Sequence, residues 1–213
     1  MIKNSSNSNN NEIKTQLLGR QAYETIVQRM QQFTAERQKN TLDEIWITEH
    51  DSVFTLGFNG KIDHIISESN IPVVRTDRGG QVTYHGPGQI VIYLLIDIKR
   101  RKLSIRNLVR LIEQAIIDLL NGYNITAHGD VKAPGVYVGN KKIAALGLRV
   151  KQKGTYHGLA LNANMDLSPY QYINPCGVTN AEITQLVDFG VTEDLNYISN
   201  KLVEKIKQLL NKQ

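Results

Sequence analysis

QIVIYLLIDI, residues 89–98, is the stretch that decides the fold of this 213-residue chain. Its residues are almost all apolar and several are β-branched, which favours a strand, and the near absence of polar alternation favours a strand covered on both faces. We therefore expect residues 89–98 to form the centre of a sheet. The run is far shorter than the roughly 20 apolar residues that a membrane-spanning helix needs, so no membrane segment is predicted.

An amphipathic helix is predicted directly after this strand. Ser104 has the residue type of an N-cap, apolar side chains recur at i, i+3 and i+4 spacing through residue 120, and Gly122 ends the pattern. The same spacing predicts a helix over residues 20–36 and a last helix that opens at Thr192.

Short strands account for much of the remaining chain, and Gly139-Asn140 favours a tight hairpin turn between two of them. The pattern predicts an α/β fold, which can also be described as α+β, with a mixed, mostly antiparallel sheet flanked by helices. Residues 4–11 are only Asn and Ser, so we expect residues 1–14 to be a disordered tail and residues 15–213 to be a single domain. The further strands are predicted at residues 44–48, 52–56, 71–75, 135–138, 142–150 and 155–163.

Composition restricts the class of protein. Twenty-five Lys and Arg residues against 20 Asp and Glu residues give a net charge of +5, but no nucleic-acid-binding module is present, so we expect no nucleic-acid partner. One cysteine cannot form an internal disulfide, and with no signal-peptide pattern the chain is expected to be cytoplasmic. The five histidines lack metal-ligand spacing, so no metal site is predicted.

RGGQVTYHGPGQ, residues 78–89, is a glycine-dense segment that leads into the apolar strand. Glycine lets the backbone approach a ligand, successive N–H groups can hold an anion or a polarised carbonyl, and Arg78 adds a fork of donors. The segment matches neither a P-loop nor a dinucleotide fingerprint. A glycine-rich turn between two strands therefore stays open as the alternative.

Lys142 begins a second segment, KIAALG, residues 142–147. Regular strand alternation places Lys142, Ala144 and Leu146 on one face. Desolvation beside small apolar neighbours would lower the pKa of the lysine, which suits a general base. The alternative is that Lys141 and Lys142 are both solvated at a hairpin tip, which is the more usual situation for two adjacent lysines.

The single cysteine, Cys176, lies in NPCGVT, residues 174–179. Thr179 and Glu182 have the spacing of a capping box, which predicts a short helix through residue 187. Free N–H groups at a helix N-terminus lower the pKa of a thiol and can hold an oxyanion, so Cys176 is a candidate nucleophile. A small buried apolar residue is the alternative.

Together these segments resemble the lipoyl(octanoyl) transferase family, the octanoyl-[acyl-carrier-protein]:protein N-octanoyltransferases. The family motifs are matched by residues 78–89, by KIAALG at 142–147, by HGLALN at 157–162 and by NPCG at 174–177. The resemblance extends over roughly residues 15–210. It implies the fold of the catalytic domains of biotin and lipoate protein ligases.

The resemblance also implies the reaction. An octanoyl group would move from octanoyl-acyl carrier protein to the acceptor lysine of lipoyl domains, in 2-oxoacid dehydrogenases and the glycine cleavage H protein. Cys176 would carry it as a thioester, and Lys142 would act as general acid/base and lower the pKa of the cysteine. No cofactor would be needed, because octanoyl-phosphopantetheine arrives on the donor. The substrate-binding residues implied are Arg78, Gly79, Gly80, Gln81, Val82, Thr83, Tyr84, His85, Ala145, Leu146, Gly147, Gly158, Leu159 and Ala160.

Two other functions share many of these features. An ATP-dependent lipoate or biotin protein ligase of the same fold forms an adenylate and needs no nucleophilic cysteine, and a carrier-binding module would bind without catalysis. For a transferase we expect an acidic acyl carrier protein to dock on a basic stretch, with a solvated loop as the alternative. The stretch consists of Lys99, Arg100, Arg101, Lys102, Arg106 and Arg110.

The choice of acyl chain length needs a closed pocket. Each buried methylene contributes about 0.8 kcal/mol, which is too little to separate eight carbons sharply from six or ten. A closed end must therefore set the upper limit. Ala144 and Ala160 leave space of the right kind near such a pocket.

Overall fold

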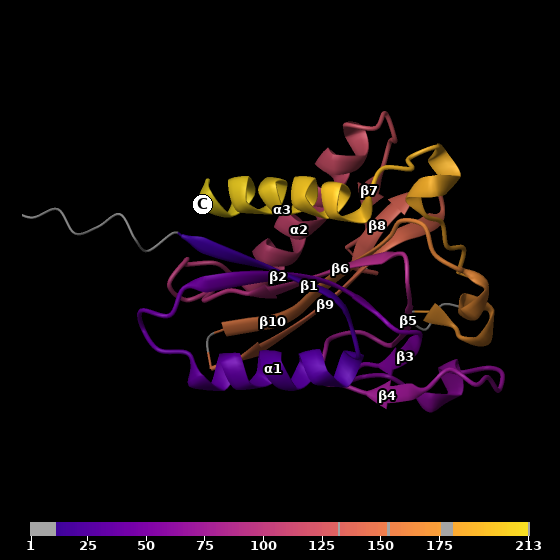
Figure 1. Cartoon of the computed structure of the whole chain (residues 1–213), viewed down its shortest axis with the longest axis horizontal. Coiled ribbons are helices and arrows are strands. Elements are labelled where there is room, and N and C mark those ends of the chain that lie inside the picture. The colour runs from indigo at the N-terminus through magenta and orange to yellow at the C-terminus, as the bar shows by residue number, and fades with distance from the viewer. Residues whose placement is uncertain (1–11, 132, 153, 176–180, 213) are drawn as a thin grey trace, which may run out of the picture.

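A seven-stranded sheet forms the frame of the molecule, with helices on both of its faces (Figure 1). The computed structural model describes residues 12–131, 133–152, 154–175 and 181–212. Only the pair at one edge, β1 and β2, is parallel, so the predicted mixed, mostly antiparallel sheet is confirmed. The strand order is β1 (Ile13–Gln21), β2 (Asp43–His50), β6 (Gln89–Leu95), β10 (Gly154–Asn162), β9 (Lys141–Lys151), β8 (Gly135–Val138) and β7 (His128–Gly129).

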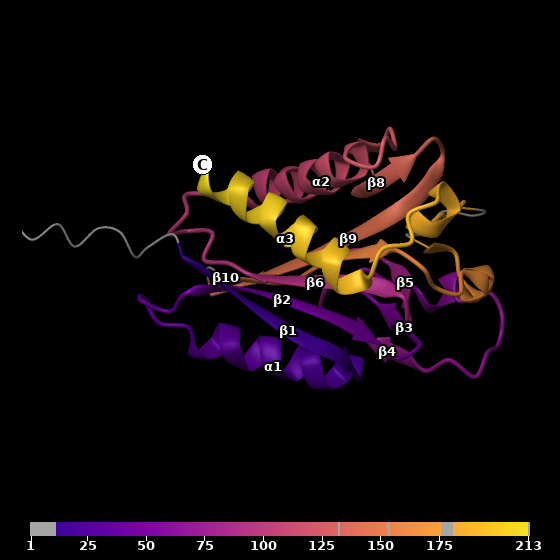
Figure 2. The ribbon, with the colours of Figure 1, turned by 45° about the horizontal axis from the view of Figure 1, so that its top comes forward.

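A smaller sheet lies at one end of the large one, beside the start of α1 (Tyr23–Glu36) (Figures 1 and 2). Its order is β4 (Val73–Arg75), β3 (Val53–Leu56) and β5 (Val82–His85), with β3 parallel to β4 and antiparallel to β5. Because only residues 86–88 separate β5 from β6, the glycine-dense segment joins the two sheets. Two short 3₁₀ helices accompany this end, η1 (Ile62–His64) and η2 (Ser168–Tyr172).

Strand β6 is buried along its whole length between two helical layers. Helices α2 (Ile105–Asn121) and α3 (Leu195–Asn211) cover one face of the sheet, and α1 covers the other (Figure 2). The prediction of a strand covered on both faces is confirmed, although β10 rather than β6 is the middle strand. The β6 side chains alternate between Ile90, Ile92 and Leu94 on the α2 and α3 side and Val91, Tyr93 and Leu95 on the α1 side.

The N-terminal boundaries differ from the prediction. Strand β1, which the sequence pattern did not reveal, includes residues 13 and 14 of the expected tail and residues 20 and 21 of the expected first helix. It is an edge strand with several exposed positions, so its apolar alternation is weak. Residues 1–11, the rest of the expected tail apart from Glu12, lie outside the described residues.

The helix caps show where local signals were sufficient. Ser104 caps α2 as predicted, with its hydroxyl accepting a hydrogen bond from the Asn107 N–H at 3.1 Å. Asp194, not Thr192, caps α3. The predicted helix through residue 187 is wrong over its described part, because residues 181–185 are not helical and a 3₁₀ helix, η4 (Leu186–Phe189), follows them. No helix among the described residues combines the length and the apolar character needed to cross a bilayer.

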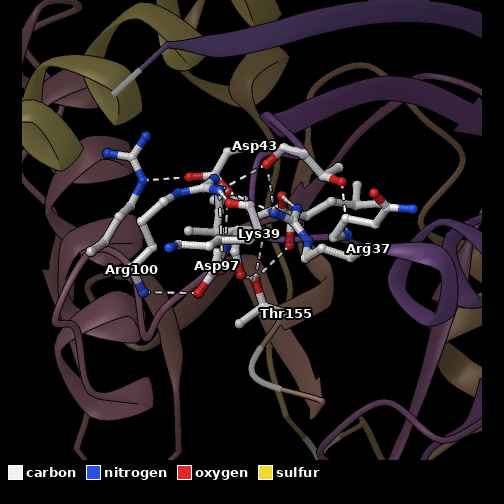
Figure 3. Close-up of polar contacts among 12 residues, drawn as sticks. Arg37, Lys39, Asp43, Asp97, Arg100 and Thr155 are labelled. Atoms are coloured by element: carbon white, nitrogen blue, oxygen red, sulfur yellow. Dashed lines mark hydrogen bonds and ion pairs between the residues drawn. The ribbon is translucent and has the colours of Figure 1, made fainter. Parts of the chain in front are cut away.

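Three arginines converge on the fully buried carboxylate of Asp43 at the start of β2 (Figure 3). Arg37 Nη1 lies 3.0 Å from Oδ1, Arg100 Nη2 lies 2.6 Å from Oδ1, and Arg101 Nε lies 2.6 Å from Oδ2. The Asp97 N–H also donates to Oδ1 at 2.8 Å. The charges of Arg100 and Arg101 are therefore used inside the fold, which removes these two residues from the expected docking surface.

Candidate active site

A pocket opens on the α1 side of the large sheet, beneath the glycine-dense segment. Its cavity volume is about 50 Å³, well below the usual range of ligand sites. The predicted substrate-binding residues line it, except Gly79 and Tyr84. The lining consists of Tyr23, Arg78, Gly80, Gln81, Val82, Thr83, His85, Val91, Tyr93, Ala145, Leu146, Gly147, His157, Gly158, Leu159 and Ala160.

Small residues on two neighbouring strands form the floor of the pocket. Strands β9, β10 and β6 lie side by side, and their register places alanines opposite each other and glycines opposite each other on the first two. Larger side chains follow on β6, so the groove over the small residues is closed there. The two rows that cross the sheet are Ala145–Ala160–Val91 and Gly147–Gly158–Tyr93.

Arg78 holds the loop above the pocket in place. Its Nε donates to Thr55 Oγ1 at 3.0 Å and its Nη2 donates to the Thr55 carbonyl at 2.6 Å. Nη1 and Nη2 also donate to the carbonyls of Gly79 and Gln81, at 2.9 and 2.8 Å. The fork of donors that the sequence suggested for a ligand thus serves the loop itself.

Two glycine contacts explain how this loop rests on β9. The Gly79 N–H donates to the Leu148 carbonyl at 3.1 Å, so Gly79 joins the loop to the strand instead of lining the pocket. A Cβ at Gly147 would lie 2.9 Å from the Gly79 oxygen, so only glycine permits this close approach. Tyr84 packs in the core of the small sheet against Phe54, and its hydroxyl lies 3.0 Å from Ser52 Oγ.

Buried aromatic and imidazole groups close the inner end of the pocket. The ring of Tyr23 stacks on the ring of His85 at 5.6 Å, and His85 Nδ1 lies 2.7 Å from the side-chain oxygen of Gln89. Burial, with smaller contributions from His50 and Arg78, lowers the pKa of His85 well below its ordinary value. This end of the pocket is therefore polar but uncharged at the imidazoles near neutral pH.

The sequence did not reveal four of the lining residues. Tyr93 is a phenol in an otherwise aliphatic strand, and His157 opens the HGLALN motif, so a signal existed for these two. Tyr23 and Val91 gave none, because helical and strand periodicity explain them fully. Only the packing of α1 against the sheet brings Tyr23 to the pocket.

A bulge in β9 determines the direction of the Lys142 side chain. Strand β8 pairs Tyr137 with Lys142 but the preceding Val136 with Ala144, which leaves Ile143 as an extra residue. Because Val136 and Ala144 pack toward α2 and α3, Lys142 and its partner Tyr137 lie on the opposite, pocket-facing side. The prediction that Lys142 shares a face with Ala144 is therefore wrong.

The side chain of Lys142 is buried at 7% exposure, whereas the neighbouring Lys141 is exposed. Its ammonium lies 3.4 Å from the Pro134 carbonyl and 5.2 Å from the centre of the Tyr137 ring. A Cβ at Gly135 would lie 2.8 Å from the Lys142 Cε atom, so the lysine extends across this glycine. Lys142 is not a solvated lysine at a hairpin tip.

A hydrogen-bonded segment connects Lys142 with the glycine-dense motif. The Lys142 N–H donates to the Glu182 carbonyl at 2.8 Å, and the Thr184 N–H donates to the Lys142 carbonyl at 3.0 Å. Asn162 Nδ2 donates to the Thr184 carbonyl at 3.0 Å, and Asn162 Oδ1 accepts a hydrogen bond from Gln89 Nε2 at 2.9 Å. Motif residues Gln89 and Asn162 thus act as internal connectors.

Cys176 and Thr179 lie outside the described residues, as do the other residues of 176–180. Before this gap, the Asn174 N–H donates to the His64 carbonyl at 2.7 Å, and after it Glu182 is joined to Lys142. The expected helix N-terminus beside the cysteine is missing from residues 181–185. The role predicted for Cys176 lies outside the described residues.

Comparison with known proteins gives consistent matches over most of the chain. The family described as "Lipoyl protein ligase A/B catalytic domain" matches residues 22–207. A relative from Nitrosospira multiformis, named octanoyltransferase, is 55% identical over 88% of this chain and 87% of its own length. Octanoyltransferases from Laribacter hongkongensis and Escherichia coli are 53% and 51% identical, over 91% and 94% of this chain and 93% and 94% of their own lengths.

Solved structures share the fold at low sequence identity. A putative lipoate protein ligase from T. acidophilum superposes with a TM-score of 0.77 at 16% identity, over 94% of this chain and 86% of its own. The biotin protein ligase from Aquifex aeolicus, in complex with biotin and ATP, gives a TM-score of 0.60 at 11% identity, over 93% and 71% of the two chains. These matches agree with the fold that the sequence motifs led us to expect.

Proposed function

Because the chain belongs to the lipoyl protein ligase A/B catalytic domain family, with octanoyltransferases above 50% identity, we infer that it is an acyltransferase that transfers octanoyl groups in protein lipoylation. The observation that supports this best is the pocket itself. Its floor consists of paired alanines and glycines that border a narrow apolar groove, and the buried Lys142 lies on the same side of the sheet.

We propose a two-step transfer through Cys176. In the first step the thiolate attacks the thioester carbonyl of the donor, the new S–C bond forms, and the bond to the departing pantetheine sulfur breaks. Lys142 gives the leaving thiolate its proton. In the second step the amine of an acceptor lysine attacks the acyl-enzyme, Lys142 takes the amine proton, and the amide forms as the Cys176 thiolate leaves.

The surroundings of Lys142 suit this role. Its side chain is buried against Pro134 and Tyr137, outside the pocket lining, and its backbone is fixed on both sides by Glu182 and Thr184. A general acid/base must be held in place and shielded from bulk water to act on one atom repeatedly. The ammonium would also favour the thiolate form of Cys176.

We propose that an acyl carrier protein supplies the octanoyl group and that lipoyl domains receive it. Arg100 and Arg101 bind Asp43 and are not available for docking. Arg106 and Arg110 are exposed basic residues on α2. They border a surface groove that is also lined by Ile105, Val109, Glu113, Asp130 and Val131, and the groove continues to Pro134, whose carbonyl accepts a hydrogen bond from the Lys142 ammonium. An acidic carrier docked there would bring its thioester close to Lys142.

No cofactor enters the proposed reaction, because conversion of a thioester into an amide is downhill. We also propose a cytoplasmic location, since acyl carrier proteins and lipoyl-dependent enzymes meet there. The second candidate is a ligase that activates its acid with ATP, which is favoured by the fold shared with an ATP-bound lipoate-protein ligase at a TM-score of 0.76.

Intact-protein mass spectrometry tests the mechanism. The protein is mixed with octanoyl-acyl carrier protein without ATP, beside Cys176→Ser as the matched control. We expect one octanoyl adduct on the unaltered protein, released by hydroxylamine, and none on the variant. Octanoyl transfer to a lipoyl domain by Cys176→Ser would overturn the role of the cysteine, and transfer only with octanoic acid and ATP would establish the ligase.

A further inference from the structure

Glu113 lies on α2, on the part of the helix that contacts the paired strands β7 and β8. Its carboxylate packs against one glycine of each strand. The Gly135 N–H donates to Glu113 Oε1 at 3.1 Å, and a Cβ at Gly129 would lie 3.3 Å from the carboxyl group. The Glu113 side chain is therefore seated against β7 and β8, where it is only partly exposed.

One peptide group joins Glu113 to Lys142. The Gly135 N–H and the Pro134 carbonyl belong to the same peptide bond, and the Lys142 ammonium donates to that carbonyl at 3.4 Å. In a trans peptide the N–H and the C=O point in opposite directions, so the carboxylate and the ammonium bind opposite sides of one planar unit. Because this unit is rigid, the carboxylate that holds its N–H also fixes the oxygen that Lys142 meets.

The path of the Lys142 side chain depends on the same peptide. A Cβ at Gly135 would lie 2.8 Å from Lys142 Cε and 3.1 Å from Nζ, so the lysine crosses directly over this residue. Beyond it, the ammonium lies 5.2 Å from the centre of the Tyr137 ring, on the same strand as Gly135. A displacement of Gly135 would therefore displace the amine.

Charge strengthens this connection. A hydrogen bond from an N–H to a carboxylate is roughly twice as strong as one between neutral groups, and it polarises the peptide so that the carbonyl becomes a better acceptor. Burial raises the pKa of Glu113, whereas the bond from the Gly135 N–H opposes this rise. Among the nearby charges, Arg110 and Lys142 also favour the carboxylate, and Asp130 disfavours it.

We propose that Glu113 is the positioning residue for Lys142, acting through the Pro134–Gly135 peptide. Glu113 holds the peptide and the peptide holds the amine, while the carboxylate favours the charged amine that gives its proton in the first step. No covalent bond to Glu113 forms or breaks. The inference rests on the proposed octanoyl transfer and adds the residue that orients its general acid/base.

Single-turnover acylation tests this role. Octanoyl-pantetheine replaces the carrier protein, because Glu113 also borders the groove on α2 and any effect on docking must be kept apart. Mass spectrometry follows the octanoyl adduct on Cys176 with time. The final yield counts the reactive molecules, so the rate constant does not depend on the fraction of protein that is folded.

The variants separate the hydrogen bond from the charge. Glu113→Ala removes the carboxylate, whereas Glu113→Gln keeps an acceptor without the charge. Asp118→Ala is the matched control, because Asp118 is a carboxylate on the same helix that binds Gln114 at 2.7 Å. A Glu113→Ala, Lys142→Met double variant shows whether Glu113 acts through the lysine.

We expect Glu113→Ala to slow acylation about 10- to 100-fold, since misplacement of a catalytic group costs about that much. Glu113→Gln should recover most of this loss, but its rate should begin to fall at a lower pH, because the anion that favours the ammonium is gone. In the Lys142→Met background, Glu113→Ala should change the rate by less than about twofold. Asp118→Ala should match the unaltered protein.

A Glu113→Ala protein that reacts as fast as the unaltered protein would overturn the inference. The same slowing by Glu113→Ala with and without the amine of Lys142 would also overturn it, because it would indicate a structural role alone. If Lys142→Met forms no measurable adduct, the pH profile of Glu113→Gln decides, and an unmoved profile is the contrary result. Absence of an octanoyl adduct on the unaltered protein would contradict the proposed function instead.

Discussion

Single residues at this site depend on irregular backbone. Lys142 reaches the pocket side of the sheet through the bulge at Ile143, and His157 turns toward the pocket through its positive φ. In an unbroken strand each of these side chains would lie on the opposite face. His157 thereby lines a pocket whose floor is otherwise apolar, and Lys142 lies on the same side of the sheet, buried against Pro134 and Tyr137.

Replacement of Lys142 by methionine tests its role at this scale. Methionine keeps an unbranched apolar side chain in the buried space and removes the amine, so we expect kcat/KM for octanoyl transfer to fall by about 10² to 10⁴ with little change in Tm. Lys141→Met, at the exposed neighbour, is the matched control and should keep its activity. Activity of Lys142→Met within tenfold of the unaltered enzyme would contradict a proton-transfer role.

Among the elements, α1, β2 and the loop after β6 are held together by one carboxylate, at the end of the sheet away from the pocket. Asp43 at the start of β2 binds Arg37 just after α1 and two arginines in the loop after β6 (Figure 3). Removing one partner from a buried ionic cluster leaves charges without compensation in a low-dielectric interior. The cluster therefore holds α1 and α2 to the same edge of the fold.

Asp43→Asn should destabilise the protein by about 3 kcal/mol, since three arginines lose their buried counter-charge. For a domain of this size this lowers Tm by about 6 to 12 °C. Asp51→Asn is the control, because Asp51 and its partner Arg20 are both exposed and such pairs contribute about 0 to 1 kcal/mol. Urea unfolding of the two variants measures the difference, and equal effects would show that the cluster is not a structural joint.

On the scale of the whole molecule, the surface of α2 is the expected docking site for the donor. Arg106→Glu combined with Arg110→Glu should raise KM for octanoyl-acyl carrier protein by about tenfold or more and leave turnover of octanoyl-pantetheine unchanged. Charge reversal at Lys14 and Lys151, which are exposed on β1 and β9 and lie outside the expected docking stretch, is the matched control. Equal effects on the carrier and on the small thioester would exclude docking at this groove.

The buried histidines predict how stability depends on pH. Burial lowers the pKa of His50 to about 4, and it lowers the pKa values of His85 and His157 as well. The unfolded chain takes up protons on these residues below about pH 6.5, while the folded protein does not. The stabilisation is therefore present above about pH 6.5 and is lost as the pH falls from there toward 4.

We expect the free energy of unfolding, measured with urea, to decrease between pH 7.5 and 5.5. Each histidine that stays neutral in the folded protein adds a slope of up to about 1.4 kcal/mol per pH unit. His50→Gln should reduce this slope, whereas His128→Gln, at an exposed histidine, should not. A free energy of unfolding that is constant or rises over this range would contradict neutral burial.

Local patterns were sufficient for the parts of the fold that repeat over many residues. The apolar run at residues 89–98 predicted the buried strand β6, and the spacing after Ser104 predicted α2 with its cap. The edge strand β1 was not predicted, because an exposed strand shows little alternation of apolar and polar residues. The supposed helix before residue 187 failed because residues 182–184 bond to Lys142, and a partner strand competes successfully with a local capping signal.

By itself the sequence determined the mixed, mostly antiparallel class and the main helices, because these follow from periodicity and residue type, and the family resemblance of its motifs indicated the residues that gather at the pocket. Only the tertiary structure decided the direction of Lys142 and His157, the use of Arg78 and Arg100 inside the fold, and the presence of Tyr23 at the pocket. A bulge, a positive φ and a buried ion pair each depend on partners far away in the chain. Those partners cannot be identified from the local sequence, so the chemistry of the site follows from the packing.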